Sequence, residues 1–381
     1  MFECCLRPRT RHDVQRRLIL VLLLLLLVRP ASAAALAATD VSFPEVVIPS
    51  ETCRGLFIVP LTFGAGDGTT VDLILDTGST WTYMDPGAIR RILGREVGAG
   101  KVLFRGGRIG PHELGPFRAY IHPMKILGLA VGREIDGILG FPVFKDVLLT
   151  LDYPAEEIRV SSGRLPRPDG NEIFRDSGYR RPHLKVDVGG RRVKILLDSG
   201  STGRFTLKPT DRLTWSVEPR PVGASVLFAS VAIYEAGRLS GALQFGPLSF
   251  EAPVVSLATD GHQVGWHVLR HFALTFDQKK NRIRMLPNGT APVRMGSLVG
   301  PGVAFRPRPG GLEIISVFPG TSAEAAGLRK GDLVIAIDGT PVHERGCADP
   351  RGDPAGQTAV WSYRRDGLQA EAVIERRNLI P

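Results

Sequence analysis

The sequence predicts a mainly β protein that contains two duplicated β units and a separate C-terminal module. The chain has 381 residues, which is enough for two or three domains. It contains 44 glycines and 29 prolines together with frequent runs of Val, Leu and Ile, a composition that favours short strands joined by turns. An acidic segment occurs twice, and the pattern changes again after about residue 297.

The N-terminal segment 1–37 has the order of a secretory signal peptide. Arginines precede an unbroken apolar run at 18–28, and small residues follow with A-x-A patterns at 31–33 and 35–37. The apolar run is shorter than the roughly 20 residues that a spanning helix needs. We therefore expect export to the periplasm or cell exterior and no stable membrane span. The alternative is an uncleaved N-terminal membrane anchor.

Charge and cysteine content exclude some classes of function. The chain has 48 Lys and Arg against 38 Asp and Glu, a net charge of +10. Part of this charge belongs to the N-terminal segment, and the remaining arginine excess is spread along the sequence. No basic block is interleaved with aromatic residues, so we expect no nucleic-acid binding. Only Cys53 and Cys347 follow the predicted signal. They fall in different predicted domains, and their spacing leaves a disulfide between them open.

An internal duplication is the most informative feature of the chain. The segment 71–80 recurs at 193–202, so that Asp198 follows Asp76 by 122 residues. Leu-Thr-Leu-Asp at 149–152 matches Leu-Thr-Phe-Asp at 274–277, at nearly the same offset. Ordered matches at a nearly constant spacing indicate repeated structural units. We predict an N-terminal lobe at 50–160 and a C-terminal lobe at 178–286.

Each lobe contains a strand that ends in an acidic turn. Asp supplies a carboxylate, Gly allows a tight turn beneath it, and the neighbouring hydroxyls can hold the carboxylate plane. Two such turns, packed about a pseudo-twofold axis, would place the carboxyl groups about 3 Å apart, where they share one proton. The predicted site comprises the catalytic pair, Asp76 and Asp198, and the supporting residues Thr77, Gly78, Ser79, Ser199, Gly200 and Ser201.

These segments resemble the pepsin/retropepsin class of aspartic proteases over residues 50–286. The resemblance is carried by the turns at 76–79 and 198–201, by Ile138-Leu139-Gly140, and more weakly by Gln263-Val264-Gly265. It implies a bilobal acid-protease fold and an aspartic endopeptidase. In this class a water activated between two aspartates hydrolyses peptide bonds, without metal or cofactor. The alternative is an inactive, peptide-binding scaffold with the same folds.

A flap over the site is harder to place. The segment around Phe104, Gly106 and Gly107 is the candidate, because glycine can supply the turn of a mobile hairpin. An ordinary surface hairpin is the alternative.

The C-terminal segment 297–381 resembles a bacterial-type PDZ domain. The resemblance rests on Pro-Gly-Thr-Ser-Ala at 319–323, Ala-Gly-Leu at 326–328 and Gly-Asp at 331–332. PDZ domains bind an extended peptide, usually a protein C-terminus, at a sheet edge. The candidate peptide-binding loop comprises Gly300, Pro301, Gly302 and Val303; a plain interdomain turn is the alternative. The expected partners are a peptide or protein substrate and a protein C-terminus at the PDZ domain.

Overall fold

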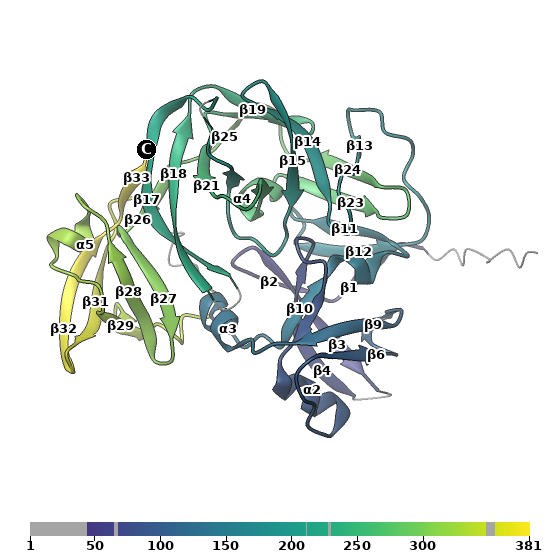
Figure 1. Ribbon diagram of the computed structural model, residues 1–381, viewed down its shortest axis with the longest axis horizontal. Helices are drawn as coiled ribbons and strands as arrows, with labels where there is room; N and C mark the ends of the chain where they lie inside the picture. The colour runs from purple at the N-terminus through teal and green to yellow at the C-terminus, as the bar shows by residue number, and fades with distance from the viewer. Residues whose placement is uncertain (1–43, 65–67, 211, 228–229, 348–354) are drawn as a thin grey trace, which may run out of the picture. The chain divides into compact units, whose positions relative to one another are not determined.

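The computed structural model describes residues 44–64, 68–210, 212–227, 230–347 and 355–381 (Figure 1). The predicted signal segment lies outside these residues. Within them, no helix is long and apolar enough to cross a membrane.

The first β unit is a nine-stranded sheet with the order β6-β9-β5-β10-β4-β3-β7-β8, and β2 pairs with β3. Its strands are β2 (Glu51–Cys53), β3 (Leu56–Phe63), β4 (Thr69–Asp76), β5 (Thr82–Met84), β6 (Lys101–Phe104), β7 (Arg108–Ile109), β8 (His112–Glu113), β9 (Phe117–Ile121) and β10 (Gly137–Gly140). Strand β4 is central because its apolar residues are buried and pair on both sides.

Three short helices accompany this sheet: α2 (Pro86–Leu93), α3 (Lys125–Val131) and the 3-10 helix η1 (Phe141–Phe144). Helix α2 begins where the Asp85 side chain accepts a hydrogen bond from the Gly87 amide, and Pro86 occupies its first turn. It ends at Gly94, whose φ of 67° suits glycine.

The second β unit contains a seven-stranded sheet with the order β14-β15-β22-β16-β21-β18-β17, a three-stranded sheet β19-β20-β25, and the helix α4 (Trp266–Leu269). The strands are β14 (His183–Val188), β15 (Arg191–Leu197), β16 (Phe205–Leu207), β17 (Trp215–Leu227), β18 (Ser230–Leu239), β19 (Ala242–Phe245), β20 (Leu248–Glu251), β21 (Val254–Leu257), β22 (Gln263–Val264) and β25 (Val293–Arg294).

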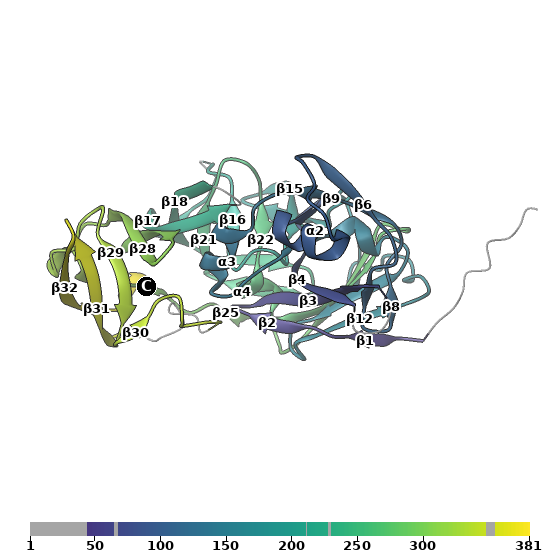
Figure 2. The same ribbon diagram turned by 90° about the horizontal axis from the view of Figure 1, so that it is seen from below.

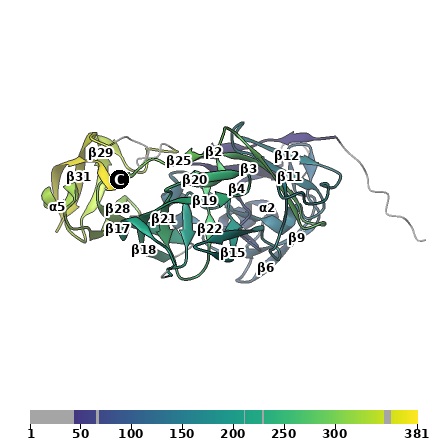
Figure 3. The ribbon, with the colours of Figure 1, turned by 90° about the horizontal axis from the view of Figure 1, so that it is seen from above.

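A six-stranded sheet joins the two units, and Figures 1 and 3 show β11 beside β12 within it. Its order is β1 (Val46–Ile48), β12 (Glu157–Ser161), β11 (Leu148–Asp152), β23 (Phe272–Asp277), β24 (Arg282–Pro287) and β13 (Ile173–Arg175). The repeated segments found in the sequence pair with each other here, because β11 and β23 are antiparallel neighbours. Thr150 lies opposite Thr275, with 2.9 Å between the hydroxyl oxygens.

The C-terminal module has a six-stranded sheet, in which β29, β31 and β32 lie side by side (Figure 2). Its elements are β27 (Val303–Arg308), β28 (Gly311–Val317), α5 (Ser322–Ala325), β29 (Leu333–Ile337), β30 (Thr340–Pro341), β31 (Thr358–Arg365) and β32 (Leu368–Glu375). Strand β26 (Leu298–Gly300) pairs separately with β33 (Arg377–Ile380). The prediction of a mainly β chain is thus confirmed.

A disulfide joins Cys53 at the end of β2 to Cys347, across 294 residues of sequence. The sequence left this pairing open. Close by, the Arg54 guanidinium donates to the carbonyl oxygens of Ala130 (2.7 Å) and Gly346 (3.2 Å). The beginning of the first β unit is therefore fastened, covalently and by hydrogen bonds, to the segment that follows β30.

Candidate functional site

The two predicted acidic turns have the same local geometry. Asp76 is the last residue of β4, and the Ser79 amide donates to the Asp76 carbonyl at 3.2 Å. Asp198 directly follows β15, and the Ser201 amide donates to the Asp198 carbonyl at 3.2 Å. Each aspartate therefore sits where a buried strand stops.

The turns are joined by four buried hydrogen bonds that relate them almost symmetrically. The Thr77 amide donates to Ser199 Oγ (2.9 Å), and the Ser199 amide donates to Thr77 Oγ1 (3.0 Å). In turn, Thr77 Oγ1 donates to the Leu197 carbonyl (2.6 Å) and Ser199 Oγ donates to the Leu75 carbonyl (2.8 Å). Each hydroxyl is used as donor and acceptor, so both are fully committed to holding the turns together.

The glycines of the turns pack beneath the opposite carboxyl groups. A Cβ on Gly78 would lie 2.4 Å from Asp198 Oδ1, and a Cβ on Gly200 would lie 2.5 Å from Asp76 Cγ. Real Cβ atoms do not approach other atoms this closely, so only glycine lets the carboxyl groups come together. The structure thus brings the predicted pair, Asp76 and Asp198, into one site.

The environment of the pair favours the protonated form. Burial is the main cause that raises the pKa of Asp76, whereas hydrogen bonds from Asp198 and from backbone amides oppose it. Burial also raises the pKa of Asp198 well above its usual range, and the adjacent Asp76 carboxylate raises it further. Asp76 Oδ1 is shielded from solvent, without a geometrically suitable hydrogen-bond partner among the described residues. Two carboxyl groups in such a position can hold one proton between them and transfer it.

Two short parallel strands support the turns from the side. Strand β10 pairs with β4, placing Leu139 beside Leu75, and strand β22 pairs with β15, placing Val264 beside Leu197. A required glycine lies at the end of each: Gly140 is the last residue of β10, and Gly265 directly follows β22. A Cβ on Gly140 would lie 2.6 Å from the Trp81 carbonyl oxygen, and one on Gly265 would lie 2.6 Å from the Ser201 carbonyl oxygen.

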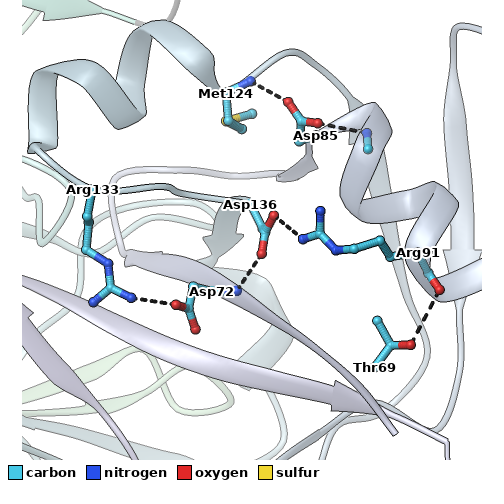
Figure 4. A network of polar contacts seen from close by, with 8 residues as sticks. Thr69, Asp72, Asp85, Arg91, Met124, Arg133 and Asp136 are labelled. Atoms are coloured by element: carbon cyan, nitrogen blue, oxygen red, sulfur yellow. Dashed lines mark hydrogen bonds and ion pairs between the residues drawn. The ribbon is translucent and has the colours of Figure 1, made fainter. Parts of the chain in front are cut away.

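A network of ion pairs fixes β4 where it enters the site (Figure 4). Asp136, which precedes β10, accepts hydrogen bonds from the Asp72 amide (3.0 Å) and from Arg91 of α2 (2.5 Å). Arg133 donates to the Asp72 carboxylate at 2.5 Å. Figure 4 shows Asp136 between Arg91 and the β4 backbone, so helix α2 and strand β10 are both held against β4.

Two residues near the pair were missed by the sequence reasoning. Arg181 donates to the Gly78 carbonyl at 3.4 Å, and its charge lowers the pKa of both aspartates. Tyr153 is buried, its hydroxyl lacks a hydrogen-bond partner among the described residues, and burial raises its pKa with a further rise from both aspartates. No periodicity or motif in the sequence connects either residue with the acidic turns.

The remaining turn residues have local roles. Ser79 Oγ donates to the Trp81 carbonyl at 2.6 Å, and Ser201 Oγ accepts from the Gly203 amide at 3.1 Å. Both hydroxyls therefore shape the chain just after the aspartates.

The residues of the predicted flap are packed into the first unit. The Phe104 side chain is buried, stacks on Phe117 at 5.7 Å and contacts Phe63 at 5.1 Å between ring centroids. A Cβ on Gly107 would lie 3.0 Å from the Phe63 ring. Gly106 forms an open turn with φ of 67°. The Phe104 side chain consequently belongs to the core, and the flap role of this turn stays a prediction.

The predicted PDZ loop is built against α5. Gly302 has φ of 85°, and a Cβ there would lie 2.1 Å from Thr321, so the position requires glycine. The Phe318 amide donates to the Gly302 carbonyl (2.9 Å), and the Ala323 amide donates to the Pro301 carbonyl (3.3 Å). The loop carbonyls are therefore occupied within the module.

Among the residues that the structure describes, no group of three or more His, Cys, Asp and Glu side chains is placed to hold a metal ion.

Comparison with known proteins identifies the C-terminal module. Residues 292–346 match the PDZ domain family. HhoA of Synechocystis sp., described as a candidate serine protease, is 47% identical over 38 residues, which is 10% of this chain and 10% of that protein. The chain thus matches about a tenth of the length of this curated relative.

Solved structures give only partial likenesses. An aminopeptidase N family protein from Idiomarina loihiensis has 24% identity, covers 22% of this chain and 14% of its own, and has a TM-score of 0.19. A PDZ domain protein from Parabacteroides distasonis has 21% identity, covers 22% of this chain and 20% of its own, and also has a TM-score of 0.19. Likenesses of this extent carry no argument about the whole chain.

These findings correct the predicted enzyme class. The sequence predicted an aspartic endopeptidase, but the named relative is a candidate serine protease, and the matched family is the PDZ domain. The prediction inferred a reaction from the resemblance of the acidic turns to those of a known family. Facing carboxyl groups on a fold determine where a proton can be held, and they do not by themselves determine the reaction.

Proposed function

We propose that this protein recruits peptide or protein ligands through its PDZ domain, by their C-terminal ends. The observation that carries this proposal is the family match at 292–346, together with a loop that directly precedes a sheet edge. Among the strands that the structure describes, β27 pairs only with β28, so we expect a peptide to add to its other side. Pro307 within β27 agrees with an edge position, since proline has no amide to donate.

Strand β27 also lies close to β17 and α3 of the two β units. A peptide that adds to β27 would meet these elements. A ligand at this edge would therefore lie beside the β units that carry the acidic turns.

The test is a binding measurement with fluorescent peptides that differ only at their C-terminus. Peptides with a free carboxylate should bind about tenfold or more tightly than the same peptides with an amidated end, because the loop recognises the carboxylate. Moving the same residues away from the C-terminus provides the matched control. Equal binding of free and amidated peptides would exclude C-terminal recognition.

We further propose that Asp76 and Asp198 form the proton-transfer centre of the chain, on two β units arranged as in the pepsin/retropepsin fold. The proposal is supported by the reciprocal hydrogen bonds of Thr77 and Ser199 and by the raised pKa of both carboxyl groups. A carboxyl titration followed by infrared spectroscopy should show one group that stays protonated above the ordinary aspartate range, and Asp198→Asn should remove it. A wild-type spectrum in which all carboxyl groups ionise normally would contradict this proposal.

The serine protease relative favours a second candidate function, proteolysis by a serine nucleophile. Ser199 does not suit this role, because its hydroxyl is already donor and acceptor in buried hydrogen bonds. Labelling with a fluorophosphonate probe tests this candidate. Covalent labelling of one serine with loss of peptide cleavage would support it, whereas no labelling of the folded protein would exclude it.

Export from the cytoplasm also remains our proposal. The Cys53–Cys347 disulfide supports it, since such bonds persist in oxidising compartments. Fractionation of cells and the mass of the mature N-terminus test it: a chain found in the cytoplasm with residues 1–37 attached would contradict export.

A further inference from the structure

One face of the first β unit combines aromatic rings with positive charges. We define the aromatic–basic face by its residues Trp81, Tyr83, Lys101, Arg118, Tyr120 and Arg180. Tyr120 of β9 lies directly opposite Tyr83 of β5 on one side and Lys101 of β6 on the other. Since side chains alternate along a strand, Arg118 lies on the same face as Tyr120. The alternate residues Phe117 and Ala119 are buried in the core.

The rings on this face are in mutual contact. The Trp81 and Tyr120 ring centroids are 5.4 Å apart with the rings nearly perpendicular, and those of Tyr83 and Tyr120 are 5.8 Å apart. Trp81 is 41% exposed, although large aromatic side chains usually become buried. Tyr83 and Tyr120 are partly exposed beside it, so the three rings form a surface on which another flat or apolar group can stack.

Cations border the same rings. The Arg180 guanidinium lies 4.4 Å from the Trp81 ring centroid, and the Lys101 ammonium lies 5.9 Å from the Tyr120 centroid. Lys101, Arg118 and Arg180 form no ion pair with a carboxylate in the described part of the chain. The positive charge of the face is therefore available to a ligand.

The loop that carries Arg180 is held by side-chain hydrogen bonds. Asp176 Oδ1 accepts hydrogen bonds from the Gly178 amide (2.8 Å) and the His183 amide (2.9 Å), which closes the loop. Arg180 has φ of 61°, a conformation that non-glycine residues seldom adopt. The next residue, Arg181, reaches the Gly78 carbonyl beside the acidic pair. This loop therefore connects the aromatic–basic face to the site.

We infer that the aromatic–basic face binds an acidic peptide segment that carries an aromatic side chain. Glutamate or aspartate side chains would pair with Lys101, Arg118 and Arg180, and the aromatic side chain would stack in the row of Trp81 and Tyr120. Charge complementarity selects this ligand, because the face offers several cations without a carboxylate partner among the described residues, and residues 38–381 still carry a net charge of +6, which is +10 for the whole chain less +4 for residues 1–37. The inference goes beyond recruitment by the PDZ domain and does not depend on it.

The experiment uses the full chain and N-terminally labelled peptides with amidated C-termini, which removes the carboxylate that a PDZ domain recognises. Fluorescence polarisation should show that a peptide alternating Glu and Phe binds about tenfold or more tightly than matched peptides with Lys in place of Glu or Ser in place of Phe. Binding should weaken with added salt. Equal affinities of the three peptides would overturn the inference.

Substitutions test whether the acidic peptide binds at the aromatic–basic face. Arg180→Glu and Trp81→Ala should each weaken binding of the acidic peptide about fivefold or more. Arg192→Glu is the matched control, since Arg192 is an exposed arginine on β15 of the other unit. If Arg180→Glu and Arg192→Glu have the same effect, the binding follows net charge alone and the assignment is wrong.

Two other anionic ligands serve as competing outcomes. If oligothymidylate binds more tightly than the acidic peptide and loses affinity in Trp81→Ala, the face is a single-strand nucleic-acid site. If phosphatidylglycerol vesicles bind more tightly and are sensitive to Arg180→Glu, the face is a membrane surface. Either result overturns the peptide assignment, and tighter binding of the peptide than of both supports it.

Discussion

The two acidic turns are nearly identical where they touch each other and different where they are supported. At the contact, Thr77 and Ser199 exchange equivalent hydrogen bonds, and Gly78 and Gly200 pack beneath opposite carboxyl groups. Away from it, β10 pairs with β4 over four residues, whereas β22 pairs with β15 over two. Bringing the two carboxyl groups together therefore requires the same residue types at the contact in both turns. The strands that support each turn are less restricted and differ between the two β units.

The electrostatic support also differs between the two β units. In the first unit, Asp136 connects Arg91 with the β4 backbone just before β10 (Figure 4). At the offset of 125 that relates β11 to β23, the corresponding residue of the second unit is Gly261, which has no side chain to make such a network. The second turn therefore relies more on the shared contact than the first turn does.

The largest expected effect comes from filling the space beneath the carboxyl groups. Gly78→Ala and Gly200→Ala should each lower the free energy of unfolding by about 3 kcal/mol, because the new methyl group would overlap the opposite aspartate. Denaturant titration measures this loss. Gly98→Ala is the control, because its Cβ meets nothing within 4 Å. Clearly unequal losses at the two turns would break the symmetry that we describe.

A smaller loss should follow removal of the connecting hydroxyls. Thr77→Val and Ser199→Ala should each cost about 2 kcal/mol, since each removes one donor and leaves a buried amide without its acceptor. Because both hydroxyls belong to one network, the double variant should lose less than the sum of the single losses. Additive losses would show that the two turns are held independently.

The pH dependence of stability should reveal the raised pKa of Asp198. A carboxyl group whose pKa is raised by folding binds its proton more tightly in the folded state, so stability falls as pH rises from the unfolded pKa of Asp toward the folded one. The pKa of Asp198 is raised well above 3.8, so Asp198→Asn should remove this fall and increase stability at neutral pH, on the order of 1 kcal/mol. Thermal melting from pH 4 to 8 measures it. An unchanged slope in Asp198→Asn would contradict the raised pKa.

The smallest effect concerns local opening. Backbone amides of β22 should exchange with solvent faster than those of β10, because β22 forms a ladder of two residue pairs and lies where the lobe has no equivalent of Asp136. Hydrogen exchange followed by mass spectrometry or NMR compares Val264 with Leu139. Equal protection would mean that the shared contact stabilises both strands alike.

The sequence predicted the parts of this protein in which chemistry restricts the residues. Where the two acidic turns contact each other, each turn needs an Asp, a residue with a hydroxyl group and a Gly. Because these residue types are required in both turns, the segments around Asp76 and Asp198 could be recognised in the sequence. The repeated Leu-Thr segments were equally visible, and they pair with each other through Thr150 and Thr275.

Other features depend on contacts between segments that are distant in the sequence, and the spacing of residues along the chain does not predict such contacts. The approach of Arg181 to Gly78 results from a loop whose path is set by Asp176. The segment around Phe104 was predicted as a flap because of its glycines, and the sequence did not show that the aromatic side chain packs against Phe63 and Phe117; the flap role itself stays a prediction. The predicted enzyme class was wrong because it was inferred from the resemblance of the acidic turns to a known family, whereas the named relative is a candidate serine protease.

The Cys53–Cys347 bond has a practical consequence for any experiment that follows the integrity of the chain. Almost the whole described sequence lies between these two cysteines, so a single backbone cut in any loop between them leaves both pieces covalently attached. On a gel run without reductant the nicked and intact chains would have the same mass. A cut between Cys53 and Cys347 therefore becomes visible only after reduction, and an apparently resistant chain can already have been cut there.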